Sequence, residues 1–241
     1  KKVKLSYIFI AILSIINILT NDFQGQYMPH AVATLYDDNY RDLAELTNEP
    51  KIEYCERYGY KFFELTEMKY SKITGFNKIH YTLELFKLHP DIDWLLFSEC
   101  DAMITNLTIP IDEKIDNDYH VIVPVDRLNI NTGNFLVRNT EQGRAWLQMI
   151  IDKEPDYILI EWAEQQVVID TIEEYQDIVK IVPQRYMNSY EPEIYDYCDA
   201  SKDIMGNSGA WAQGDWIVHW PGTYKNVRLK RAERVGRQII R

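Results

Sequence analysis

Short runs of apolar residues alternate along the chain with longer segments whose apolar residues recur at helical spacing. The runs that predict buried strands lie at 31–36, 94–97, 121–125, 134–137, 178–182 and 216–218. The segments that predict helices lie at 39–57, 77–89 and 162–172. Because strands and helices alternate, the sequence predicts a single α/β domain with a mostly parallel sheet and helices on both faces.

A further helix is predicted after the strand at 134–137. Asn139 and Gln142 have the spacing of a capping box, in which the side chains of the first turn satisfy free backbone amides. The side chains that this helix is expected to bury are Ala145, Trp146, Met149 and Ile150.

Residues 1–20 have the pattern of a signal anchor, because lysines at the start precede an apolar run that ends at Leu19. No small-x-small cleavage site follows, so we expect the segment to be retained. The chain would then be a single-pass type II membrane protein, with 21–30 as a short linker. Residues 31–241 would form a lumenal domain of the Golgi or endoplasmic reticulum if the source is eukaryotic. The run is short for a membrane span, and a buried helix of the globular domain is the alternative.

Composition excludes several classes of protein. The chain has 241 residues, of which 46% are apolar and 26% charged, and this excludes a disordered chain and a polytopic membrane protein. A net charge of −11 argues against nucleic acid as a partner, because neutralising phosphates needs a basic surface. Residues 225–241 are predicted to form a basic helix. Its charges indicate a solvated face or, alternatively, a phosphate or membrane contact.

Acidic residues follow two of the predicted strands. The first strand ends at Tyr36-Asp37-Asp38, and the strand at 94–97 is followed by Ser98-Glu99-Cys100-Asp101. Ligands of open α/β sheets bind beyond the carboxyl ends of the strands. Oxygen ligands in such a turn suit Mg²⁺ or Mn²⁺, although an acidic turn can also be ordinary solvated surface.

His219 is a candidate third ligand. It stands at the end of a predicted strand, directly before the turn that contains Pro221 and Gly222. A lone histidine in this position can be structural, but together with Glu99 and Asp101 it would complete a metal site. The sequence has no Gly-x-Gly-x-x-Gly, phosphate-binding Gly-Lys-Ser/Thr or Gly-x-Ser-x-Gly motif. Dinucleotide-dependent dehydrogenases, P-loop enzymes and α/β-hydrolases are therefore disfavoured.

Several short blocks occur in a fixed order between residues 31 and 225. In chain order the blocks are Tyr54-Cys55-x-Arg57-x-Gly59-Tyr60, Gly75-Phe76-Asn77-Lys78, His89-Pro90, Phe97-Ser98-Glu99-Cys100-Asp101-Ala102, Asn131-Thr132-Gly133-Asn134-Phe135-Leu136-Val137-Arg138-Asn139, Glu164-Gln165, Gln184, Asn188-Ser189-Tyr190, Gly214-Asp215 and His219-Trp220-Pro221-Gly222. This ordered set resembles the family 34 glycosyltransferases, the galactosyl/mannosyl/xylosyltransferase group with a GT-A fold. The chain departs from the family pattern at Tyr58, where histidine is usual, and at Glu99, which replaces the first Asp of the D-x-D motif.

The resemblance implies a role for each matched residue. Asp101 and His219 would bind Mn²⁺ (or Mg²⁺), and Glu99 would reach the metal through water or contact the ribose. The residues implied in binding the nucleotide-sugar donor are Thr34, Tyr36, Lys78, Glu99, Cys100, Asp101, Asn131, Thr132, Gly133, Gly222 and Lys225. For several of them a role without ligand contact stays open: Tyr36 could pack on the sheet, and Lys78 and Lys225 could be solvated. Residues 131–133 could form a simple hairpin turn.

The residues implied at the reacting centre are Asp126, Glu164 and Gln165. Family 34 enzymes retain anomeric configuration. Retention can proceed through a covalent intermediate on a carboxylate, or by a front-face route that needs no protein nucleophile. The sequence leaves both routes open.

These observations predict a metal-dependent retaining glycosyltransferase that moves a sugar from a UDP- or GDP-linked donor to a hydroxyl of a glycan or glycoprotein. The alternatives are another GT-A glycosyltransferase, including an inverting one, a non-catalytic sugar- or nucleotide-binding relative, and a structural module. Self-association into a homo-oligomer is left open. Asn106-Leu107-Thr108 is a glycosylation sequon, which is consistent with a lumenal domain.

Overall fold

The computed structural model describes residues 29–191 and 202–241, and its main feature is a six-stranded sheet with the strand order β2-β1-β3-β6-β5-β7. In chain order the strands of this sheet are β1 (Ala31–Leu35), β2 (Lys61–Leu65), β3 (Trp94–Ser98), β5 (Val121–Pro124), β6 (Asn134–Arg138) and β7 (Val179–Val182). A second sheet of three short strands has the order β4-β9-β8. Its strands are β4 (Ala102–Ile104), β8 (Ser189–Tyr190) and β9 (Ile217–His219).

The main sheet is mixed but mostly parallel, as predicted, because five of its six strands run in one direction and β6 runs against them. β1 runs parallel to β2 and β3, and β5 runs parallel to β7, but β6 is antiparallel to both of its neighbours. Only residues 125–133 connect β5 to β6. A parallel crossover needs a dozen residues or more, so this short connection makes the pair antiparallel.

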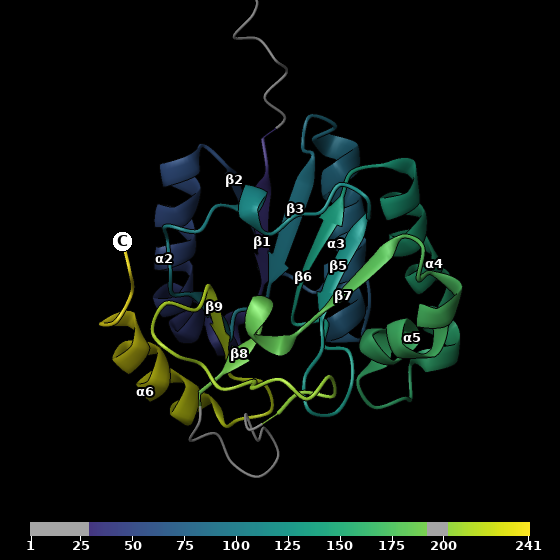
Figure 1. Cartoon of the computed structure of the whole chain (residues 1–241). Coiled ribbons are helices and arrows are strands. Elements are labelled where there is room, and N and C mark those ends of the chain that lie inside the picture. Colours follow the sequence, from purple (N-terminus) through teal and green to yellow (C-terminus); the bar gives the residue numbers. More distant parts are fainter. Residues whose placement is uncertain (1–28, 192–201) are drawn as a thin grey trace, which may run out of the picture.

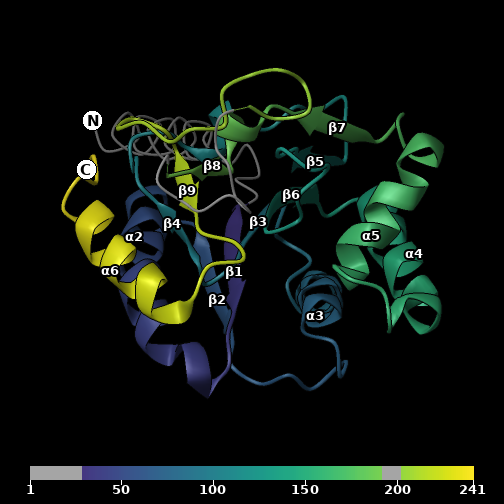
Figure 2. The same ribbon diagram turned by 90° about the horizontal axis from the view of Figure 1, so that it is seen from below.

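Helices cover both faces of the main sheet (Figure 1). One face is covered by α3 (Thr74–Leu88), α4 (Glu141–Tyr157) and α5 (Ala163–Thr171). The other face is covered by α2 (Arg41–Tyr58) and by the second sheet, while α6 (Lys225–Gly236) packs on the outside of α2. Figure 2 shows α2 and α6 on one side of the strands and α3, α4 and α5 on the other. Short 3-10 helices lie at Asp38–Tyr40, Ile111–Glu113, Ile172–Glu174 and Gln184–Tyr186.

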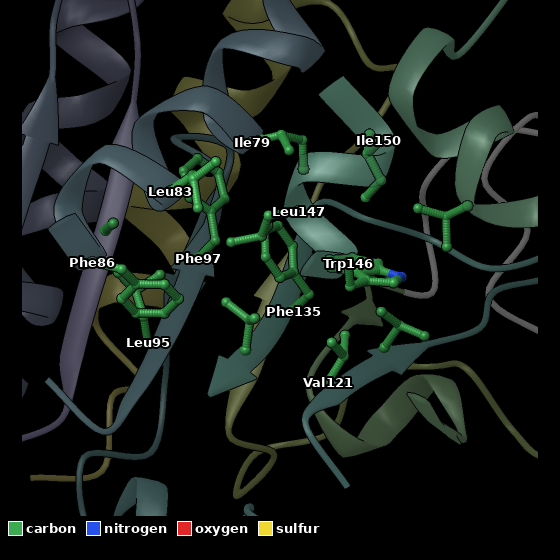
Figure 3. Close-up of a cluster of buried hydrophobic side chains, with 14 of the residues drawn as sticks. Ile79, Leu83, Phe86, Leu95, Phe97, Val121, Phe135, Trp146, Leu147 and Ile150 are labelled. Carbon is green, nitrogen blue, oxygen red and sulfur yellow. The ribbon is translucent and has the colours of Figure 1, made fainter. Parts of the chain in front are cut away.

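The larger apolar core lies between the sheet and α3, α4 and α5 (Figure 3). The rings of Phe97 and Phe135 stack with centroids 5.5 Å apart, and the ring of Trp146 packs against that of Phe135 at 6.1 Å. Burying each large apolar side chain contributes about 1.5–3 kcal/mol to stability. This core therefore holds β3, β5 and β6 in fixed positions relative to the helices.

The start of α4 differs from the prediction by one residue. Thr140, and not Asn139, is the N-cap, and its Oγ1 accepts a hydrogen bond from the Gly143 amide at 3.2 Å. Threonine is itself a strong N-cap residue, so two adjacent candidates competed for this position. Trp146 and Ile150 are buried as predicted, whereas Ala145 is exposed and Met149 is partly buried.

Two sequence predictions concern a membrane-anchored, lumenal arrangement of the chain. The predicted anchor at 1–20 lies outside the described residues. Among the residues that are described, no helix is both long enough and apolar enough to cross a membrane.

The sequon residue Asn106 is 8% exposed, and its Nδ2 donates to the carbonyl oxygen of Gly214 at 2.9 Å. A glycan on this nitrogen would displace that contact, so the sequon does not support a glycosylated surface.

Candidate active site

A cavity of about 720 Å³ opens at the edge of the main sheet where β1, β3 and β5 end. Tyr36 follows β1, Glu99 follows β3 and Asp126 follows β5, and all three line the cavity. Because β6 runs the opposite way, it contributes through its amino end, where Gly133 lines the same cavity. The rule that ligands bind beyond strand carboxyl ends therefore located the cavity, and the antiparallel strand adds a fourth wall.

Glu99, Asp101 and His219 converge in this cavity, as the sequence predicted. One ligand atom from each lies within 4.8 Å of the others. The Nε2 of His219 is 3.2 Å from Oδ1 of Asp101 and 3.7 Å from Oε2 of Glu99. His219 stands on the second sheet, where β9 pairs with β4 so that His219 is opposite Ala102. This register places the imidazole beside the turn that precedes β4.

The imidazole of His219 is held on two further sides. Its Nδ1 is 2.7 Å from Oδ1 of Asn188, which leaves Nε2 directed at the carboxylates. A Cβ atom added at Gly133 would lie 2.3 Å from Cε1 of His219, so the glycine permits this close approach. Burial would lower the pKa of His219, but the negative charges of Asp101 and Glu99 outweigh it and raise the pKa.

Both carboxylates stay ionised, although Asp101 is buried and Glu99 is partly buried. Burial would raise the pKa of Glu99, but the ammonium of Lys78 and the imidazole of His219 lower it to about 2. The pKa of Asp101 is likewise lowered, because His219 and the Arg228 guanidinium outweigh the effect of burial. The Nη2 atom of Arg228 lies 3.2 Å from Oδ2 of Asp101. Both ionised groups therefore offer an anionic oxygen that a metal ion can bind.

Lys78 links the turn that carries Glu99 and Asp101 to Glu164, a residue predicted at the reacting centre. Its Nζ is 2.8 Å from Oε1 of Glu99 and 2.7 Å from Oε1 of Glu164, and the side chain is 2% exposed. Burial would lower the pKa of Lys78, but the two carboxylates raise it. A buried cation between two carboxylates is stable only in this paired form, so the three side chains act as one unit.

Glu164 and Gln165 are oriented by a strained backbone. Trp162 and Ala163, which precede them, have φ values of 64° and 38°, in the left-handed region of the backbone that residues other than glycine rarely adopt. The hydroxyl of Thr132 donates to Oε1 of Glu164 at 3.1 Å, and the Thr132 amide donates to Oε1 of Gln165 at 3.1 Å. These contacts fix both side chains at the cavity wall.

Asp126 lines the cavity but also organises its own loop. Its Oδ1 accepts hydrogen bonds from the amides of Leu128 and Asn129, at 2.7 and 3.1 Å. Its Oδ2 accepts from Nδ2 of Asn131 at 3.1 Å and from the hydroxyl of Tyr190 at 2.9 Å. With donors at both oxygens, Asp126 is suited to shaping the pocket rather than to attacking a substrate.

The cavity includes most of the predicted donor-binding residues. Those that line it are Tyr36, Lys78, Glu99, Cys100, Asp101, Asn131, Gly133 and Gly222. Thr34 and Thr132 are buried behind the lining, with exposures of 0% and 1%. Burial raises the pKa of the Cys100 thiol, which therefore stays neutral.

The cation on α6 that reaches the cavity is Arg228, which the sequence interpretation missed. The predicted residue, Lys225, instead pairs with Asp42 at 2.7 Å outside the lining. Arg228 is three residues further along α6, about one helical turn from Lys225. Burial of a basic side chain in an otherwise basic helix gives no signal in the sequence alone.

The residues present fit a divalent metal. Two ionised carboxylates and one imidazole nitrogen form the oxygen-and-nitrogen set that suits Mn²⁺ and, less closely, Mg²⁺. The contact from Asn188 fixes the orientation of the histidine, as partners of metal-binding histidines commonly do.

Comparison with known sequences identifies the family to which the chain is similar. Residues 29–118 and 112–225 match the sequence model of the galactosyl transferase GMA12/MNN10 family. An alpha-1,2-galactosyltransferase of Schizosaccharomyces pombe is 27% identical over 226 residues, which cover 74% of this chain and 56% of that protein. Xyloglucan 6-xylosyltransferase 1 of Arabidopsis thaliana is 29% identical over 101 residues, which cover 38% of this chain and 22% of that protein. The matched region is thus about half or less of these relatives.

Solved structures share the fold. A glycosyltransferase involved in the glycosylation of the major capsid of PBCV-1 superposes with a TM-score of 0.69 and 16% identity, over 86% of this chain and 99% of that chain. The glycosyltransferase GlyE of Streptococcus pneumoniae TIGR4 gives a TM-score of 0.55 and 15% identity, over 87% and 62% of the two chains. The fold is therefore the mixed α/β fold of GT-A-like glycosyltransferases.

Proposed function

Because the chain belongs to the galactosyl transferase GMA12/MNN10 family, we propose that it is a metal-dependent retaining glycosyltransferase. It moves a hexose or pentose from a UDP- or GDP-linked donor to a hydroxyl of a glycan or glycoprotein. The observation that carries the proposal is the convergence of Glu99, Asp101 and His219 on one point of a cavity large enough for a nucleotide-sugar.

In this proposal each charged side chain has a part in binding or orienting the donor. Asp101 and His219 hold Mn²⁺, with Glu99 as a third ligand directly or through water. The ion would neutralise the negative charge that develops on the departing nucleoside diphosphate. Arg228 orients Asp101 and adds a positive charge to the wall that faces the diphosphate. Tyr36, beyond β1, meets the nucleoside.

Glu164 and Gln165 stand at the sugar end of the cavity. The ion pair with Lys78 keeps the Glu164 carboxylate close to Glu99, which is one of the predicted metal ligands. If Glu164 is a nucleophile, it must leave this pair to reach the anomeric carbon. In a front-face route it stays paired, and a donor phosphate oxygen takes the proton of the acceptor hydroxyl. Gln165 would then support the positive charge of an oxocarbenium-like centre through its amide oxygen.

We further propose that residues 1–20 anchor the domain in a membrane and that the domain faces the lumen. The support is the basic flank and apolar run of the sequence. Protease protection of the full chain in microsomes tests this arrangement. Digestion of the domain without detergent contradicts it.

The function is tested by screening UDP-galactose, UDP-xylose and GDP-mannose with glycan acceptors, with and without Mn²⁺. The wild-type protein is expected to transfer one of these sugars with its anomeric configuration retained, as read by NMR. Asp101→Ala and His219→Ala should each lower the transfer rate about 100-fold or more, because each removes a metal ligand. Lys230→Ala, on an exposed position of α6, is the matched control.

Two outcomes would contradict the proposal. Turnover of Asp101→Ala or His219→Ala at the wild-type rate with metal supplied defeats the site assignment. Binding of nucleotide without transfer to any acceptor favours a non-catalytic relative. The presence of Glu99 where the family pattern has Asp is the feature of this chain that motivates this alternative.

A further inference from the structure

Helix α2 carries buried polar side chains that no part of the proposed reaction uses. Thr47 and Lys51 are both 0% exposed and stand four residues apart, so they lie on the same face of the helix. Burying a lysine is unfavourable unless its ammonium has polar partners. Both side chains point at one place, which is the back of the turn that presents Glu99 and Asp101.

The contacts of the two side chains cover successive carbonyl groups of that turn. Thr47 donates from Oγ1 to the carbonyl oxygen of Cys100 at 2.7 Å. Lys51 donates from Nζ to the carbonyl oxygen of Glu99 at 2.8 Å and approaches that of Ser98 at 3.5 Å. The carboxylates leave the turn on the cavity side, while its carbonyl groups are held from behind.

The backbone amides next to the turn are also engaged. The Glu99 amide donates to the carbonyl oxygen of Gly133 at 3.0 Å, and the Trp220 amide donates to that of Asp101 at 3.0 Å. The turn is thus tied to the residue before β6, to the residue after β9 and, through Thr47 and Lys51, to α2. A shift of the backbone by a fraction of an ångström would move both carboxylates relative to His219.

The contacts of Lys51 are consistent with this arrangement. Its Nζ carries more than one N–H bond and can therefore donate to more than one carbonyl group. Its Nζ is also 3.4 Å from Oδ1 of Asn48, which fixes the side chain within the helix face.

We propose that Thr47 and Lys51 are positioning residues that hold the Glu99–Asp101 turn in the geometry needed to bind a divalent cation. They touch neither donor nor metal, and they act through the backbone of the turn. The proposal rests on the proposed function only in assigning the cation site. It extends that site to a helix that lies behind the cavity wall.

Direct Mn²⁺ binding tests the proposal without relying on transfer. Free Mn²⁺ is measured by electron paramagnetic resonance during titration of the purified full chain with the metal alone. Thr47→Val keeps the shape of the side chain and removes the donor, and we expect its dissociation constant for Mn²⁺ to rise about tenfold. The matched control is Thr171→Val, because Thr171 is 3% exposed and donates to the carbonyl oxygen of Val167 in α5, away from the turn.

The transfer assay gives the second readout. At saturating Mn²⁺ the kcat of Thr47→Val should return to within about twofold of the wild-type value, because only the geometry of the empty turn is changed. Lys51→Met should weaken Mn²⁺ binding in the same direction. If Lys51→Met does not fold, as judged by its unfolding midpoint without metal, Thr47→Val alone decides the question.

The outcomes separate this proposal from the proposed function. Equal Mn²⁺ affinity in Thr47→Val, Thr171→Val and wild type overturns the positioning role. Tighter Mn²⁺ binding by Lys51→Met also overturns it, because that result would mean that Lys51 acts only as a repelling charge. A wild-type protein that binds Mn²⁺ but transfers no sugar contradicts the proposed function and leaves the positioning test intact. Failure of the wild-type protein to bind Mn²⁺ overturns both.

Discussion

The two carboxylate oxygens of Glu99 contact different neighbours. Its Oε1 is 2.8 Å from the ammonium of Lys78, and its Oε2 is 3.7 Å from Nε2 of His219. Aspartate, the residue that the family pattern has at this position, ends one methylene closer to the backbone. A shorter side chain on the same turn could not keep both contacts. The length of Glu99 therefore suits the two contacts that it makes in this site.

The first prediction follows from the length of Glu99. Glu99→Asp restores the D-x-D spacing of the family, yet we expect the transfer rate to fall about 10- to 100-fold, because the link to Lys78 and Glu164 is lost. Steady-state kinetics with the donor found in the screen measure the effect. Glu53→Asp is the control, since Glu53 pairs with Arg241 on the surface at 2.9 Å. A Glu99→Asp protein as active as wild type would contradict this account.

At the scale of elements, α6 shows how an excess of basic residues is accommodated. Residues 225–241 carry most of their charge in ion pairs with the acidic remainder of the chain. Arg231 and Arg234 both contact Glu191, at 2.9 and 2.8 Å, and Arg228 contacts Asp101 in the cavity. The helix is thus neither a plain solvated face nor a single phosphate patch. It fastens the segment around β8 and supplies one cation to the site.

The second prediction distinguishes the two cations of α6. Arg228→Met should raise the KM for the nucleotide-sugar about tenfold, because the cavity loses a positive charge and Asp101 loses a partner. Lys225→Met should leave the KM unchanged, since Lys225 pairs with Asp42 outside the cavity lining. Donor titrations of the transfer rate compare the two variants. The reverse pattern would return the diphosphate contact to Lys225.

For the whole molecule, the sequence predicted those parts of the fold that depend on local patterns. The buried strands around Leu95, Ile122 and Leu136 produce continuous apolar runs, and each is present within one or two residues of its predicted position. The direction of β6 could not be predicted from its apolar run, because strand direction depends on the connection. The strand Lys61–Leu65 and the short strands Ala102–Ile104 and Ser189–Tyr190 were missed. The last two are too short to give a measurable periodicity.

The site was predictable to a different extent. Glu99, Asp101 and His219 were recognisable because acidic and imidazole groups at strand ends indicate metal chemistry. Lys51 and Arg228 were not, because in sequence a buried basic residue on a helix resembles a solvated one. Their roles depend on which carbonyl group or carboxylate the fold brings to them. Residues that act through a contact far along the chain become visible only in three dimensions.

The central claim concerns one cation held jointly by the two sheets of the molecule. The most direct measurement is an anomalous difference map at the manganese absorption edge, from crystals grown with Mn²⁺ and UDP or GDP. We expect one strong peak about 2.0–2.3 Å from Nε2 of His219 and from a carboxylate oxygen of Asp101. A map without a peak at this position, or with the ion bound away from His219, would contradict the claim.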